Sequence, residues 1–179
     1  MRAAQVGVAL AIALALQTTL VPMLTGAATV DLVLVVVLAV AMKQGAVVGL
    51  WTGTVGGLLQ DALSGGVVGV GGLAKTLVGY FVGRFASQFD VDRFWQQTVV
   101  FFFGSLLHAG VFVGIYSMLS EDPMLSSYAA ALTQAGLNTV AGIGGGLVLV
   151  AVPSVEERQR RRQRQRRQEW KKARLLDEI

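Results

Sequence analysis

Three polar residues lie deep inside apolar segments of this chain: Lys75, His108 and Asn138. At 1.5 Å per helical residue, Lys75 is about 12 Å from the start of its segment, the end that we expect on the outer side of a membrane. His108 and Asn138 are about 15–17 Å from the starts of their segments. An ionisable group at such a depth in a membrane is by default a hypothesis for a functional site, such as a ligand or proton site.

Structural roles are the alternative for the same three residues. Lys75 would then pair with Asp61 across a tight outer turn, or extend to the membrane interface. We favour this role because no acidic residue lies at the depth of Lys75 itself. For His108 and Asn138 we favour hydrogen bonds between helices, since buried polar side chains commonly link membrane helices in this way.

The chain contains few of the residues that conventional catalytic sites use. There is no cysteine and only one histidine, so thiolate metal sites, cysteine nucleophiles and disulfides are excluded. The run from Gly69 to Gly72 lacks the Lys-Ser/Thr that follows a phosphate-binding loop. A membrane enzyme would need a nucleophile–base pair or a metal cluster. We therefore expect no enzymatic activity, no cofactor and no metal.

The elements that must position these residues are apolar segments of helical length. The chain is 54% hydrophobic and only 15% charged, against roughly 25% charged residues in soluble domains. A helix needs about 20 residues to cross the hydrocarbon core. The sequence predicts an all-α membrane protein whose residues 1–152 form a six-transmembrane-helix bundle. The predicted segments are 3–22, 30–42, 44–60, 67–86, 97–119 and 128–152.

The second segment is the shortest, and it spans the membrane upright only if it takes in residues 24–29, which would bury Asp31. The first segment could instead belong to a cleaved signal peptide over residues 1–28. Its apolar run of about 19 residues exceeds the usual 7–15, so we favour a transmembrane helix.

Loop charges predict the orientation. With six crossings, one side holds every basic loop residue and the other only acidic ones, as the positive-inside rule predicts. We expect a multi-pass protein with both termini on the cytoplasmic side of the membrane. The inner residues are Arg2, Lys43, Arg84 and Arg93, and the outer ones are Asp31, Asp61, Glu121 and Asp122.

A basic tail, residues 153–179, follows the last segment. Residues 156–179 hold ten of the fifteen Lys and Arg, so the basic character belongs to the tail and does not indicate nucleic-acid binding. Ser154 and Glu157 can form a capping box that starts a cytoplasmic helix. A solvated tail held near anionic lipid is the equal alternative. Lipid or cytoplasmic-partner contacts are predicted for Arg158, Arg160, Arg161, Arg162, Arg164, Arg166, Arg167, Lys171 and Lys172.

Glycines four residues apart recur in the apolar segments. This spacing places them on one helix face, where the missing side chains let two backbones approach closely. The pattern predicts tightly packed helices. The pairs are Gly49 and Gly53, Gly53 and Gly57, Gly79 and Gly83, Gly110 and Gly114, and Gly142 and Gly146.

The most distinctive string is Asp61-x-x-Ser64-Gly65, a turn between two glycine-rich segments that we expect to start after a helix ends at Asp61. Gly79-Tyr-x-x-Gly83-Arg84 follows it, and Val30-Asp31-Leu precedes it. These residues resemble the family of the rod shape-determining protein MreD. The resemblance covers most of residues 1–152, and the arginine-rich tail departs from many members.

The resemblance implies a non-catalytic scaffold in the bacterial inner (cytoplasmic) membrane, part of the cell-elongation complex that makes peptidoglycan. Its partners would be an MreC-like bitopic protein, an MreB-like filament and the glycosyltransferase–transpeptidase pair. It also implies the fold of energy-coupling-factor transporter substrate-binding subunits, so a vitamin-transporter subunit, with Lys75 and Asn138 at a pocket floor, is the alternative function. The residues with predicted structural or interaction roles are Asp61, Ser64, Gly65, Gly69, Lys75, Gly79, Gly83 and Arg84.

Overall fold

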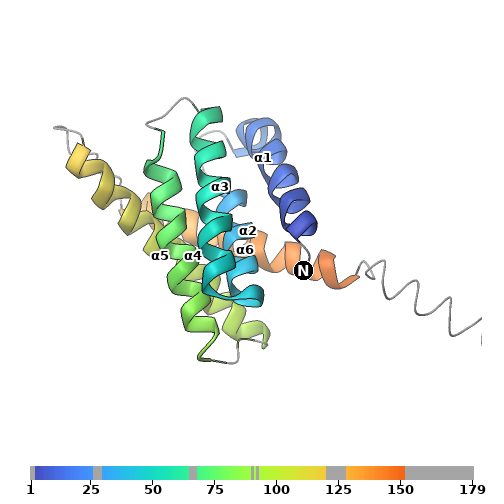
Figure 1. Cartoon of the computed structure of the whole chain (residues 1–179). Coiled ribbons are helices and arrows are strands. Elements are labelled where there is room, and N and C mark those ends of the chain that lie inside the picture. The colour runs from blue at the N-terminus through green and yellow to red at the C-terminus, as the bar shows by residue number, and fades with distance from the viewer. Residues whose placement is uncertain are drawn as a thin grey trace, which may run out of the picture. The chain divides into compact units, whose positions relative to one another are not determined.

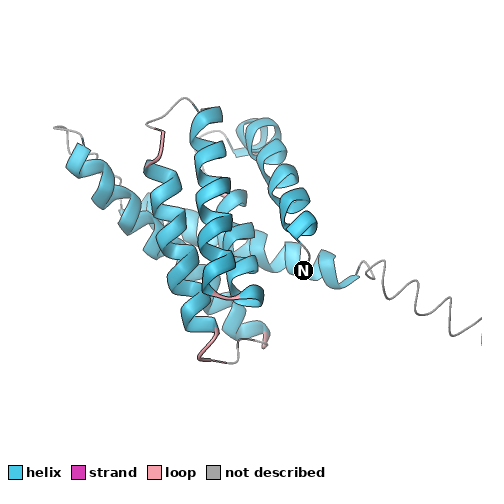
Figure 2. Cartoon of the chain, in the orientation of Figure 1, coloured by secondary structure: helices cyan, strands magenta, loops and turns pink. Residues whose placement is uncertain are grey.

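The computed structural model describes residues 3–25, 30–64, 68–89, 91, 93–119 and 128–151. Six α-helices and no strand occur among these residues (Figures 1 and 2). The all-α prediction is therefore confirmed for this part of the chain. The helices are α1 (Ala3–Thr25), α2 (Leu32–Gln44), α3 (Ala46–Ser64), α4 (Val70–Ala86), α5 (Phe94–Leu119) and α6 (Tyr128–Ala151).

The chain divides into two compact units, residues 1–143 and residues 144–179. The first unit holds α1 to α5 and most of α6, and all contacts given below lie inside it. Of the second unit, only residues 144–151 at the end of α6 are described. The predicted boundary between residues 152 and 153, and the whole basic tail, lie outside the described residues.

Helix α2 is the central element of the first unit. It is apolar all round, as expected of a helix with neighbours on every side. One face packs on α1, where Val33 and Val40 join a cluster with Leu10. Another face packs on α4 and α5, where Leu38 meets Phe101. Its short sequence of Val, Leu and Ala therefore forms the core itself.

Helices α3 and α4 run antiparallel and side by side (Figure 1). Glycine makes this approach possible, because a Cβ on Gly57 would lie 2.6 Å from Cα of Gly72, and one on Gly83 would lie 2.6 Å from Cα of Ala46. A hydrogen bond of 2.8 Å between the hydroxyls of Thr54 and Thr76 crosses the same interface. The predicted glycine packing on α3 and α4 thus occurs within the chain.

Several helix ends differ from the predicted segments by a few residues, and at two of them a side-chain contact lies at the new end. Helix α3 continues past Asp61 to Ser64, whose hydroxyl donates to the carbonyl oxygen of Gln60 at 2.6 Å. Helix α5 begins at Phe94 instead of residue 97, because Gln96 Oε1 accepts a hydrogen bond from the backbone N–H of Arg93 at 3.0 Å. This contact is one half of a capping box.

Large apolar side chains cover the outward faces of the helices. Trp51 on α3, Phe81 on α4 and Phe103 on α5 are each more than half exposed. By length and composition together, α5 is the one helix in the described part that qualifies as a membrane span. Ala3–Thr19 and α2 are apolar over shorter lengths.

Candidate functional site: a buried polar network

An ion pair between Asp31 and Lys75 forms the centre of the buried polar network. Asp31 immediately precedes α2, and its Oδ1 accepts a hydrogen bond from the N–H of Leu34 at 2.9 Å, which caps the helix. Its Oδ2 lies 2.8 Å from Nζ of Lys75 on α4. Both residues are at most 5% exposed. The two charges therefore face each other away from solvent.

The predicted partner of Lys75 was wrong. We expected Asp61 from the neighbouring turn, and we expected Asp31 to lie in an outer connection. Because α2 begins only at Leu32, Asp31 lies in the interior as its N-cap and directs Oδ2 at Lys75. Asp61 is used elsewhere, by the backbone at the start of α4.

His108 on α5 is the third member of the network. Its Nε2 lies 3.4 Å from Nζ of Lys75, and its side chain is buried. Its Nδ1 is buried and has no hydrogen-bond partner among the described residues. The ring also packs near Phe112, one turn further along α5, with centroids 6.0 Å apart. Lys75 therefore links α2 and α5.

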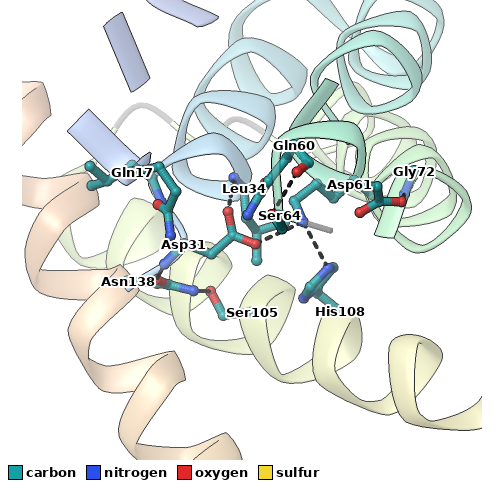
Figure 3. A network of polar contacts seen from close by, with 12 residues as sticks. Gln17, Asp31, Leu34, Gln60, Asp61, Ser64, Gly72, Ser105, His108 and Asn138 are labelled. Atoms are coloured by element: carbon teal, nitrogen blue, oxygen red, sulfur yellow. Dashed lines mark hydrogen bonds and ion pairs between the residues drawn. The ribbon is translucent and has the colours of Figure 1, made fainter. Parts of the chain in front are cut away.

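Two side-chain amides bind the backbone at the start of α2 (Figure 3). Asn138 on α6 accepts from the N–H of Asp31 at 2.8 Å and donates to the hydroxyl of Ser105 at 3.2 Å. Gln17 on α1 donates to the carbonyl oxygen of Val30 at 2.7 Å and accepts from the N–H of Leu32 at 2.8 Å. The network thus draws on α1, α2, α4, α5 and α6.

The carboxylate of Asp61 holds the start of α4. Its Oδ2 accepts hydrogen bonds from the N–H groups of Gly69, at 2.8 Å, and Gly72, at 3.0 Å. An anion is favoured there because the first N–H groups of a helix have no partner within the helix. Gly69 has a φ of 106°, a left-handed conformation that glycine adopts without strain. The motif residues Asp61 and Gly69 therefore join two consecutive helices.

The sequence model of the family described as rod shape-determining protein MreD matches residues 3–135, which contain Gln17, Asp31, Asp61, Lys75 and His108. The chain belongs to the MreD family. No curated protein and no solved structure matches this chain. The resemblance identified from the sequence motifs is confirmed, and the family indicates a role in rod-shape determination.

The other predicted site residues of this MreD-family chain that the structure describes lie outside the buried polar network. Gly79 faces the backbone of Gly49, and Gly83 faces Ala46, so both serve the α3–α4 contact. Ser64 and Arg84 are exposed. Gly65 and every predicted contact residue of the basic tail lie outside the described residues.

Sequence reasoning gave no role in this network to Gln17 and Ser105, and it placed Asp31 outside the core. Each sits in an apolar segment or at its edge, which is the signal that could have found it. The partners are far apart in sequence: Asp31 and Asn138 are separated by 107 positions. Only the tertiary fold of this MreD-family chain, which brings α6 to the start of α2, makes this contact.

The network joins charges and amides and does not pair a nucleophile with a base. The Ser105 hydroxyl accepts from Asn138, and the imidazole of His108 contacts Lys75. No group of three or more His, Cys, Asp or Glu that could hold a metal ion is found in the part of the chain with assigned positions. Chemically, the arrangement can neutralise two buried charges and fasten helices to one another.

Proposed function

We propose that this MreD-family protein is a non-catalytic integral membrane scaffold of the bacterial cell-elongation complex, which synthesises peptidoglycan. The family match over residues 3–135 carries this proposal, because the family is described by its role in rod shape. The buried network supports it, since a network that fastens five helices suits a rigid support for other proteins.

A multi-pass position in the inner membrane, with six crossings and both termini cytoplasmic, is part of the proposal. Its support is the distribution of polarity: exposed aromatic and aliphatic side chains surround a core that contains Asp31, Lys75, His108 and Asn138. Soluble proteins rarely expose apolar patches beyond a few hundred Å². In membranes, ionisable groups face the protein interior.

Helix α2 is too short to cross a membrane, and the backbone before it is bound by side chains of other helices. Thirteen residues extend about 20 Å, less than the hydrocarbon thickness of about 30 Å. With Lys43 at the inner interface, the non-helical backbone at Val30 and Asp31 would lie near mid-membrane. Backbone groups at that depth need protein partners, and Gln17 and Asn138 are such partners.

Partner docking is proposed on the outer faces of the helices. The glycine pairs of α3 and α4 are already used inside the chain. A Cβ on Gly110 or Gly114 of α5 would meet nothing within 4 Å, so this pair is the one we propose for a helix of the MreC-like bitopic protein. The MreB-like filament and the synthase pair would join directly or through that protein.

The basic tail is proposed to bind anionic lipid or a cytoplasmic partner, as its sequence predicts. The alternative function, a vitamin-transporter subunit, finds no support in the family match and is not part of the proposal.

Depletion of the protein from its own bacterium tests the scaffold. Cells should lose rod shape, and expression of the wild-type chain should restore it. Asp31→Ala should restore shape poorly, because it leaves Lys75 as a buried charge without its counter-ion. Leu73→Ala, at an exposed position of α4, is the matched control and should restore shape fully. Rod-shaped cells after verified depletion would overturn the proposal.

A further inference from the structure

Helices α3 and α4 present bulky apolar side chains on their outward surface, which we call the α3–α4 face. Four of these side chains are 47–62% exposed: Trp51 and Leu59 on α3, and Leu73 and Phe81 on α4. Helices dock most closely where small residues meet, but glycines such as Gly57 already face the contact between α3 and α4. Lipid chains adapt to bulky side chains, so lipid is the occupant that fits this face.

The α3–α4 face is shorter than a bilayer is thick. Helix α4 has 17 residues, whereas crossing a hydrocarbon core takes about 20. At the end that we place outside, the carboxylate of Asp61 holds the N–H groups of Gly69 and Gly72. At the inner end, Arg84 is exposed. The rise from Gly69 to Arg84 is about 22 Å, and an undisturbed hydrocarbon layer is about 30 Å thick.

The polar groups at the two ends of the face have little reach beyond these limits. Asp61 has a short side chain, and its Oδ2 is held by two backbone N–H groups. Arg84 lies in the last turn of α4. Because Cα–Cβ bonds tilt toward the start of a helix, its side chain leaves the backbone toward the membrane centre and must turn back to reach water. Long side chains therefore make up little of the missing height.

Helix α5 is longer than α4 and is inclined to it (Figure 1). Its 26 residues measure about 39 Å, which exceeds the hydrocarbon thickness. A helix with excess length fits a thinner layer by tilting. The inclination therefore lets α5 share one thin layer with the α3–α4 face.

We propose that the α3–α4 face binds lipids with short acyl chains and thins the bilayer around it. The inference rests on the membrane position proposed for this MreD-family protein. A bilayer that meets a short apolar face compresses its chains or gathers shorter ones there, because the alternative draws polar groups into hydrocarbon. Lys75 is about 9 Å from Gly69 along α4, so its ion pair with Asp31 stays inside the thinner layer. A thinned patch also favours other proteins with short spans, which suits a scaffold.

Nanodiscs made from lipids of different length test the preference. Full-length protein would be placed in dimyristoleoyl, dioleoyl or dierucoyl phosphatidylcholine, in order of increasing length. Each lipid would carry the same fraction of phosphatidylglycerol with matching chains, so that the surface charge stays constant. The thermal unfolding midpoint should be highest in the dimyristoleoyl lipid and several degrees lower in the dierucoyl lipid, because the longest chains leave the largest mismatch.

Trp51 reports on the α3–α4 face itself. The chain has 3 tryptophans, so Trp95→Phe/Trp170→Phe leaves Trp51 alone. Brominated dioleoyl phosphatidylcholine quenches the fluorescence of a tryptophan that it contacts. Dimyristoleoyl lipid mixed with this quencher should compete for the surface around Trp51 several times better than dierucoyl lipid does. The competition measures lipid binding, which a general effect of lipid on stability would not change.

A longer face should prefer longer lipid. Arg84→Leu extends the apolar surface at the end of α4 to Phe85 and Phe89, both exposed, so the highest unfolding midpoint should move to the dioleoyl lipid. Arg84→Gln is the matched control, because it removes the charge and keeps a polar side chain at the same level. It should retain the wild-type order of lipids. Equal behaviour of the two variants would contradict an effect of apolar height.

An unfolding midpoint that is independent of chain length, or highest in the dierucoyl lipid, would overturn the proposal. Equal competition by the short and the long lipid at Trp51 would do the same. Failure of the membrane position is a separate result, because cysteine labelling that contradicts six crossings removes both claims. Labelling that agrees with six crossings, together with no lipid preference, overturns the thinning alone.

Discussion

Lys75 and Asp31 depend on each other, because each is the charge that makes the burial of the other tolerable. Breaking a buried ion pair from one side is much more costly than replacing both partners, since it leaves a charge without compensation. Asp31 would keep its hydrogen bond from Leu34 if Lys75 were lost. It would lose the ammonium ion 2.8 Å from its other oxygen.

Lys75→Met should therefore destabilise the protein by about 3–5 kcal/mol, as measured for broken buried pairs. The double variant Asp31→Asn/Lys75→Met should recover part of this loss, because both charges are then absent. Thermal unfolding in detergent, together with the amount of folded protein in membranes, measures the effect.

Arg84→Met is the control for this cycle, because Arg84 is a cation of the same helix with an exposed side chain. It should change stability little. If Lys75→Met, Asp31→Asn and the double variant were all as stable as the wild type, the ion pair would have no energetic role.

At the scale of helices, α3 and α4 form the closest contact because glycine occurs on both sides of it. A Cβ on Gly79 would lie 2.8 Å from the carbonyl carbon of Gly49. This atom is backbone, so it cannot rotate away as the end of a side chain could. Any larger residue would have to push the helices apart, and the start of α4 would then lose its alignment with Asp61.

Gly79→Leu should therefore reduce the folded protein sharply. Gly110→Leu, at an exposed position where an added Cβ meets no atom within 4 Å, should fold normally. Size-exclusion profiles of the two purified variants make the comparison. If Gly110→Leu folds but no longer co-purifies the MreC-like protein, the proposed docking face on α5 gains direct support. Equal loss of folded protein in both variants would contradict the close α3–α4 contact.

At the scale of the whole molecule, the driving forces differ from those in a soluble protein if the surroundings are lipid. Lipid tails are as apolar as leucine, so burying Leu38 gains little beyond close packing. Specificity must then come from packing shape and from polar contacts. In the first unit, the Asp31–Lys75 pair and the amides of Gln17 and Asn138 provide these contacts.

Single cysteines test the proposed orientation, because the chain contains none. Lys43→Cys and Ser64→Cys are at exposed positions, at opposite ends of the α2–α3 region. A membrane-impermeant thiol reagent added to intact spheroplasts should label position 64 and leave position 43 unlabelled until the membrane is opened. Labelling of position 43 in intact spheroplasts would refute the six-crossing arrangement.

Much of the helical architecture could be read from local sequence. Apolar runs bounded by polar or glycine-rich residues predict helices, and all six predicted segments coincide with helices in the described part. The ends shifted where single side chains decide them, as Gln96 does for α5. The turn motif around Asp61 and Gly69 was recognisable for the same reason, because its partners are close in sequence.

The sequence by itself determined the helices, the glycine-rich contact between α3 and α4, and the family. These properties depend on residue type and short spacing. Only the tertiary structure decided which carboxylate neutralises Lys75. Asp61 is closer along the chain, but its oxygen binds the N–H groups at the start of α4. Asp31 meets Lys75 because α2 begins inside the protein, and the packing of the helices around α2 sets that position.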